Sequence, residues 1–251
     1  MPSRQAVVLP TSALTPVDVQ TVVATPSPEA GGSAADYFSM GRKVKGRLSL
    51  SGVPLVDQQN YTSCGEAAFV MDWNFLHPAQ PLDVEVVQAA GLELGVYFPS
   101  GLPGPHGYLG TSPAGMAAIG TYYADRFHAP PPMAGNLDLD MGDAYARQEA
   151  LGLLFSQLSA GRAVIIEATD VIGEPSRTVN DSHYVVVTGM DFTAGHVFFN
   201  DPYLFLSTSG KYSGAARVAE WTDFWASWSR NRDINPGTGA RAGRGWYMLV
   251  R

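Results

Sequence analysis

Hydrophobic and polar positions follow different periods in the two halves of the chain. In the first half, apolar residues recur at helical spacing and predict helices over residues 64–76, 83–94, 114–127 and 143–160. In the second half, apolar and β-branched runs predict strands over residues 163–167, 183–190, 196–200 and 245–250, with one helix over residues 220–228. A short alternating strand over residues 47–51 precedes all of these elements. Helices first and hairpin-connected strands second predict an α+β fold with an antiparallel sheet.

The segments outside these elements are rich in small residues, glycine and proline. Residues 1–36 contain many Pro, Ser, Thr, Ala and Val residues, which predicts an extended or flexible segment before one folded domain over residues 37–251. They lack the run of about 7–15 apolar residues of a signal peptide, and no run approaches the ~18 residues of a membrane span. We therefore expect no membrane span, and the cytoplasm is favoured over export. Residues 95–112 form a long Gly- and Pro-rich loop, a kind of loop that often carries function.

Composition excludes several classes of function. Of the 251 residues, 45% are hydrophobic and 16% are charged, as in a globular protein, and the net charge of -7 with no long basic run argues against a nucleic-acid partner. The single cysteine excludes an intramolecular disulfide and multi-cysteine metal sites. Four acidic and amide residues are spaced like calcium ligands, but the glycine of a calcium loop is misplaced and its final Glu is absent; they are Asn136, Asp138, Asp140 and Asp143. We expect neither a metal nor another cofactor.

The single cysteine, Cys64, lies at the predicted start of a helix. Backbone N–H groups and the helix dipole favour a thiolate at such a position, and Gly65 would leave room beside the sulfur for a substrate carbonyl. A buried cysteine with no chemical role is the alternative. Gln58, six residues earlier, could donate a hydrogen bond to an oxyanion together with the Cys64 N–H. The adjacent Gln59 could compete for that role.

The predicted hairpin of residues 183–190 and 196–200 offers a partner for this cysteine. If Asp191 pairs with Gly195 at the turn, Val185 lies opposite Asp201. His183 shares a face with Val185, so Asp201 lies diagonal to His183, roughly 7–8 Å away between backbones. Side chains bridge that distance. His183 is therefore the predicted base, with Asp201 as the residue that orients it.

Two alternatives remain open in this hairpin. A slip of one residue in the register would place Asn200 on the face of His183 instead of Asp201. His196 would lie about 16 Å from Asp201 along the ladder, which makes it a poorer base. The other three histidines end a helix or lie in loops, and we expect them at the surface: His77, His106 and His128.

Two sequence blocks resemble a known family. The run VPLVDQQNYTSCGEAAFVMDW is similar to the glutamine–cysteine block of papain-like cysteine peptidases related to the double-glycine leader peptidases of bacterial bacteriocin export systems. The run SHYVVVTGMDFTAGHVFFNDPY is similar to their histidine–aspartate block. The resemblance implies a papain-like fold in which the nucleophile helix packs on a C-terminal antiparallel sheet. It also implies that Cys64 is the nucleophile, His183 the base, Asp201 the orienting acid and Gln58 the oxyanion donor.

These residues predict a cysteine-dependent amide or peptide hydrolase that acts through a thioester acyl-enzyme, with a peptide or small amide as substrate. The same residues would serve an acyltransferase or a transglutaminase-like, amide-forming enzyme, because the first half-reaction is shared. A binding module that kept the fold without the reaction is a third hypothesis. The transporter-linked relatives also have membrane and ATPase segments, which this sequence lacks. The aromatic stripe in the predicted helix 220–228 indicates core packing rather than a ligand surface; its members are Trp221, Phe224, Trp225 and Trp228.

Overall fold

The computed structural model describes residues 46–169, 172, 182–203, 217–231, 233–234, 236, 238–239, 241–242 and 244–251. The extended segment predicted over residues 1–36 lies outside the described residues, as does the beginning of the predicted domain.

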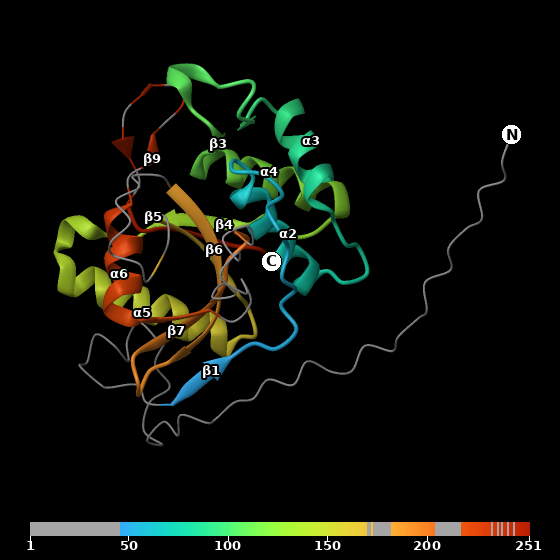
Figure 1. Cartoon of the computed structure of the whole chain (residues 1–251). Coiled ribbons are helices and arrows are strands. Elements are labelled where there is room, and N and C mark those ends of the chain that lie inside the picture. The colour runs from blue at the N-terminus through green and yellow to red at the C-terminus, as the bar shows by residue number, and fades with distance from the viewer. Residues whose placement is uncertain are drawn as a thin grey trace, which may run out of the picture.

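A seven-stranded sheet forms the centre of the described chain (Figure 1), and every strand pairing in it is antiparallel. Its strand order is β4-β11-β5-β6-β7-β8, and β1 pairs with the end of β6 beyond β5. The strands are β1 (Arg47–Ser49), β4 (Met133–Asn136), β5 (Val164–Thr169), β6 (Ser182–Asp191), β7 (His196–Asn200), β8 (Arg217–Glu220) and β11 (Trp246–Leu249). The antiparallel sheet confirms the predicted fold class.

Five helices accompany this sheet in the described part of the chain. They are α2 (Cys64–Leu76), α3 (Val84–Glu93), α4 (Pro113–Phe127), α5 (Asp143–Ser159) and α6 (Trp221–Arg230). Each lies where the sequence predicts a helix, within two residues at either end. Ser112 caps α4 through a hydrogen bond of 3.2 Å that its hydroxyl accepts from the Gly115 N–H. Within the described residues, no helix has both the length and the apolar character to cross a membrane.

The loop predicted over residues 95–112 contains short elements of its own. Two short strands, β2 (Tyr97–Phe98) and β3 (Gly110–Thr111), pair with each other, and the 3-10 turn η1 (Pro105–Gly107) lies between them. Elsewhere, a second 3-10 turn, η2 (Leu139–Met141), precedes α5, and two more short strands pair near the C-terminus, β9 (Asp233–Ile234) and β10 (Arg241–Ala242). The pairing of β2 with β3 therefore joins the two ends of the loop of residues 95–112.

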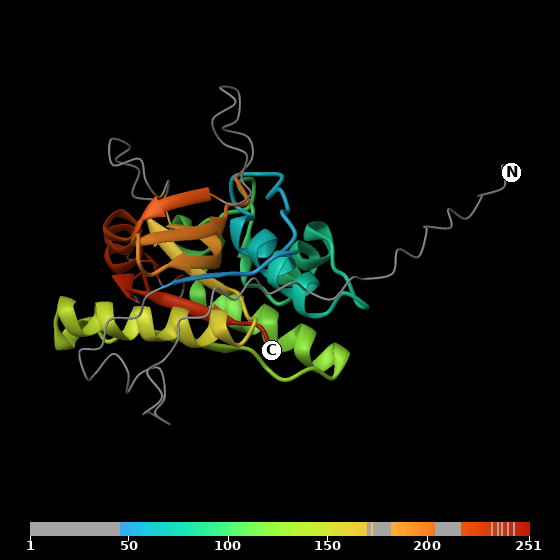
Figure 2. The same ribbon diagram turned by 90° about the horizontal axis from the view of Figure 1, so that it is seen from below.

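Helices lie on both sides of the central strands. In Figures 1 and 2, α2 and α3 lie on one side of β5 and β6, and α6 lies on the other. Three members of the aromatic stripe of α6 are buried, as predicted: Phe224, Trp225 and Trp228 are each at most 1% exposed. The fourth, Trp221, is only partly buried. Two indole groups of the stripe also donate hydrogen bonds of 2.8 Å, from Trp225 to Asp143 Oδ1 and from Trp228 to the Trp246 carbonyl.

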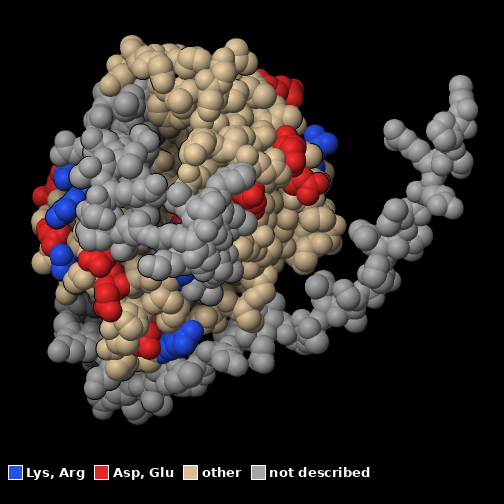
Figure 3. Space-filling view, viewed as in Figure 1, with Lys and Arg blue, Asp and Glu red and all other residues tan. Residues whose placement is uncertain are grey.

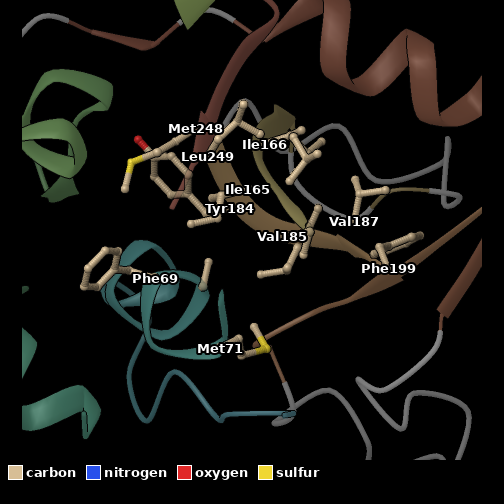
Figure 4. Packing of buried hydrophobic residues seen from close by; sticks show 14 of the residues in the cluster. Phe69, Met71, Ile165, Ile166, Tyr184, Val185, Val187, Phe199, Met248 and Leu249 are labelled. Carbon is tan, nitrogen blue, oxygen red and sulfur yellow. The ribbon is translucent and has the colours of Figure 1, made fainter. Parts of the chain in front are cut away.

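Helix α2 is the buried central helix of the molecule. All of its residues from Gly65 to Trp73 are buried, and Phe69 and Met71 project into the same apolar cluster as Tyr184 and Val185 of β6 (Figure 4). A helix that is buried on every side must be apolar nearly all round. The buried part of the helix, GEAAFVMDW, meets this condition except at Glu66 and Asp72.

Gly65 lets α2 approach β6 closely. A Cβ atom at this position would lie 2.7 Å from the Sδ atom of Met116 and 3.3 Å from the ring of Tyr184. The space beside Gly65 is therefore filled by protein side chains, and the expectation that this glycine leaves room for a substrate carbonyl is wrong. The glycine serves packing.

Candidate active site

Cys64 is the first residue of α2 and is partly exposed, in contrast to the fully buried residues that follow it. The preceding turn is fixed by side chains. The Ser63 hydroxyl donates to the carbonyl of Gln58 rather than capping the helix, and the side chain of Asn60 accepts from the N–H of Thr62 at 2.9 Å. The thiol thus projects from the rigid start of a buried helix.

Gln58 is buried beside this turn, and its backbone is held on both sides. Its N–H donates to the carbonyl of Pro202 at 3.0 Å, which ties it to the residue that follows Asp201. One N–H of the Gln58 side-chain amide donates to the carbonyl of Asn60 at 2.7 Å. Gln59 is exposed instead, and its amide donates to Glu85 of α3 at 2.7 Å. The structure therefore directs only Gln58 inward.

His183 and Asp201 meet at one end of β6 and β7. His183 Nε2 lies 2.8 Å from Asp201 Oδ1, and both side chains are largely buried. Asn200 does not share this contact, because its side-chain amide donates to the carbonyls of Val53 and Pro54 at 3.2 and 3.3 Å. Of the two residues that the sequence left open as the histidine partner, the structure places Asp201 against His183.

The register of this hairpin differs from the predicted one near its turn. Asp191 pairs with His196, not with Gly195, so the predicted pairing is wrong at that end. A β-bulge between Val187 and Gly189 then shifts the register by one residue, and Val187 pairs with Phe199. From the bulge onward the pairing is the predicted one, with Val185 opposite Asp201 by extension.

The ionised form of this pair is favoured on both partners. Burial of His183 lowers its pKa, but the charge of Asp201, the hydrogen bond to it, and the hydrogen bond and charge of Cys64 raise the pKa to about 10. Burial raises the pKa of Asp201, whereas His183, Arg217 and the Tyr203 N–H outweigh burial and lower it below 3.8. The thiol of Cys64 is thus close enough to His183 to interact with its imidazole.

Arg217 is a member of the site that sequence reasoning missed. Its guanidinium forms an ion pair with Asp201 through Nη1 and Oδ2. It comes from β8, a four-residue strand of sequence RVAE that the hydrophobic pattern did not predict. If that strand had been predicted as the neighbour of β7, Arg217 could have been found, because it pairs with Phe199, two residues before Asp201.

Aromatic rings lie beside His183, and the loop of β2 and β3 contacts its strand. The ring of Tyr203 lies 6.2 Å from that of His183 in an edge arrangement, and the ring of Tyr61 lies 5.8 Å from that of Tyr203. Tyr61 is 80% exposed. On the loop, the Thr111 carbonyl accepts from the Tyr184 hydroxyl at 3.0 Å. The loop is therefore fastened to the strand that carries His183.

The surface over α3 has a different character. Acidic side chains gather there, at the right of the view in Figure 3; they include Asp83, Glu85 and Glu93, which are exposed. The contact between Gln59 and Glu85 joins this surface to the turn of Gln58. The acidic surface of α3 therefore adjoins the turn that precedes Cys64.

The other histidines do not join this site. His77 Nε2 lies 3.3 Å from the Arg251 carbonyl, and His196 lies 2.9 Å from Glu220 in an exposed pair. Among the described residues, no group of His, Cys, Asp and Glu side chains could hold a metal ion. Asn136 and Asp143, two of the acidic and amide residues considered above, bind protein groups: Asn136 donates to the Arg244 carbonyl, and Asp143 pairs with Arg147.

Comparisons with known proteins agree with the fold described above. A crystal structure from Bacillus anthracis, whose description places that protein among C39-like peptidases, matches with a TM-score of 0.50 and 13% identity. The match covers 82% of this chain and 98% of the other, and it shows the fold. A search of curated proteins finds no match. The sequence profile of the peptidase C39-like family matches residues 50–234, well over half of the chain, so this chain belongs to that family.

Proposed function

We propose that this protein is a cysteine-dependent hydrolase of amide or peptide bonds, with Cys64 as nucleophile and His183 as base. Membership of the C39-like family supports cysteine peptidase chemistry. The observation that carries the proposal is the 2.8 Å pair of His183 and Asp201, whose imidazole also interacts with the thiol at the start of α2. A buried histidine held between a carboxylate and a thiol is the arrangement that activates a cysteine nucleophile.

The first half-reaction forms a thioester. With Nε2 engaged by Asp201, the Nδ1 atom of His183 takes the proton of the Cys64 thiol. The thiolate attacks the carbonyl carbon, a C–S bond forms, and the carbonyl oxygen becomes an oxyanion. When this intermediate collapses, the C–N bond breaks, and the imidazolium gives its proton to the leaving amine.

The oxyanion would be stabilised by Gln58 and the backbone N–H of Cys64. The contact with the Asn60 carbonyl uses one N–H of the Gln58 amide and fixes its orientation, and the second N–H would donate to the oxyanion. Loss of one such donor commonly costs about 3–4 kcal/mol of transition-state stabilisation. Water, deprotonated by His183, then attacks the thioester and releases the acid.

The rate of Cys64 alkylation by iodoacetamide tests the activated thiol. Because the chain has one cysteine, the label can only lie on Cys64. At a pH of about 6, a free thiol is less than ~1% thiolate, so we expect His183→Ala to slow alkylation by about a hundredfold. His196→Ala is the matched control, because it removes a histidine that also pairs with a carboxylate at 2.9 Å. Equally slow alkylation of the wild type and of His183→Ala would contradict the proposal.

Hydrolysis is tested separately with a mixture of unmodified peptides. Mass spectrometry should detect new cleavage products with the wild type and none with Cys64→Ala. Added hydroxylamine should trap the acyl group as a hydroxamate, because a thioester reacts readily with amines. Activated alkylation without any product, with or without hydroxylamine, would leave the thiol reactive but refute the hydrolase proposal.

A further inference from the structure

Arg217 contacts Asp201 on the side away from His183. The two oxygens of the Asp201 carboxylate are divided between two partners, since Oδ1 faces His183 Nε2 and Oδ2 accepts from Arg217 Nη1. Oδ1 also accepts from the Tyr203 N–H at 2.9 Å. This division leaves the carboxylate little freedom to rotate.

The strand register explains how the three side chains meet. His183, Asp201 and Arg217 come from three neighbouring parts of one sheet: β6, the end of β7, and β8. Arg217 pairs with Phe199, so it lies diagonal to Asp201, as His183 does from the other side. The side chains of His183, Asp201 and Arg217 thus follow one diagonal across the three strands.

The guanidinium of Arg217 has contacts besides the carboxylate. Its Nη2 donates to the carbonyl of Ile172 at 3.3 Å, and its Cζ atom lies 5.4 Å from the ring centroid of Phe199. Its side chain is only 16% exposed. A cation that is held by three different groups is fixed in place, and a fixed cation can orient a carboxylate.

We propose that Arg217 is a positioning residue of this site, which holds Asp201 ionised and turned toward His183. This inference rests on the proposed function and adds to it a fourth charged group, which acts through Asp201. Burial, which raises the pKa of Asp201, and His183, which lowers it, have the largest effects on this carboxyl group. Arg217 lowers the pKa further, by a smaller amount. Without the arginine, Asp201 takes up a proton at higher pH, and the imidazolium that stabilises the thiolate loses its anionic partner.

The pH dependence of Cys64 alkylation tests the inference in the full chain. We expect Arg217→Met to move the acidic limb of the profile to higher pH and to lower the rate on that limb by at least about tenfold, because a shift of one pH unit changes the thiolate fraction tenfold. Arg217→Lys keeps the charge and should keep the limb near that of the wild type. Arg47→Met is the matched control, because Arg47 lies 4.2 Å from the ring centroid of Phe198 on the same strand β7.

The outcomes separate the inference from the proposed function. An acidic limb that is unchanged in Arg217→Met, or shifted equally in Arg217→Lys, would overturn the positioning role. If Arg217→Met fails to fold, Arg217→Lys carries the test, and a limb shifted by one pH unit in that variant would also overturn it. If the wild-type thiol is unactivated and does not respond to His183→Ala, the proposed function fails.

Discussion

Stability of this fold should fall as pH rises from about 5 to 8, because α2 buries two carboxyl groups. Glu66 and Asp72 are both fully buried. Glu66 accepts a hydrogen bond from the Thr111 hydroxyl. Burial raises the pKa of Glu66 from 4.5 to about 7, against the smaller effect of that hydrogen bond, and raises the pKa of Asp72 from 3.8 to about 8.

The sign of the effect follows from proton binding. Between pH 4.5 and about 7, the folded protein holds a proton on Glu66 that the unfolded chain has released. Each such group lowers the free energy of unfolding by about 1.4 kcal/mol per pH unit in its window, which for Glu66 totals about 3 kcal/mol. His183, with its raised pKa, contributes stability that is complete below 6.5 and is lost as pH rises through about 10, so it acts in the same direction.

The variant Glu66→Gln isolates one of these groups. It keeps an oxygen to accept from Thr111 but cannot ionise, so its free energy of unfolding relative to the wild type should increase by about 3 kcal/mol between pH 5 and 8. Urea denaturation followed by tryptophan fluorescence measures this difference, since Trp73 lies buried on the same helix. Glu93→Gln, on the exposed side of α3, is the control. A difference between Glu66→Gln and the wild type that does not change with pH would refute the reasoning.

Two further predictions concern the same site. Gly65→Ala should lower the free energy of unfolding by about 1–3 kcal/mol, because the added Cβ would overpack against the Met116 sulfur. Gly101→Ala is the control and should change this free energy little, because a Cβ there meets nothing within 4 Å. Thermal denaturation of both variants compares them, and equal effects would contradict the packing argument. Asp201→Asn should lower the pKa of His183 from about 10, because burial of the ring is then opposed by Cys64 alone. Ring nitrogen NMR measures this pKa, and an unchanged titration would show that Asp201 is not the cause.

The sequence predicted the helices of this fold better than its short strands. Helix α2 begins and ends as predicted, because its apolar run is long and His77-Pro78 ends it. Strands β4 and β8 have four residues each, MAGN and RVAE, which are too short and too polar to show a period of two. Their pairing is decided by neighbours far away in the chain. For that reason the sequence contained Cys64, Gln58 and the hairpin as local patterns but did not indicate Arg217.

The buried acids of α2 could not be predicted from the sequence either. A helical pattern places Glu and Asp on the solvent side by default, and α2 has no solvent side along most of its length. Such residues become recognisable only when the whole core is assembled around the helix. The sequence predicts the helix, but the burial of Glu66 and Asp72 depends on the helices and strands that pack around it.

The bulge in β6 determines which side chain meets His183. If the pairing at the turn, Asp191 with His196, continued without a bulge, Asp201 would lie opposite Val186 and point to the other face, and Pro202 would take its place opposite Val185. The bulge inserts one residue between Val187 and Gly189 and restores the face. A Cβ on Gly189 would lie 2.7 Å from the Leu48 carbonyl oxygen of β1, so glycine is required where β1 joins the bulged strand. The position of Asp201 therefore depends on a backbone irregularity more than ten residues away in the sequence.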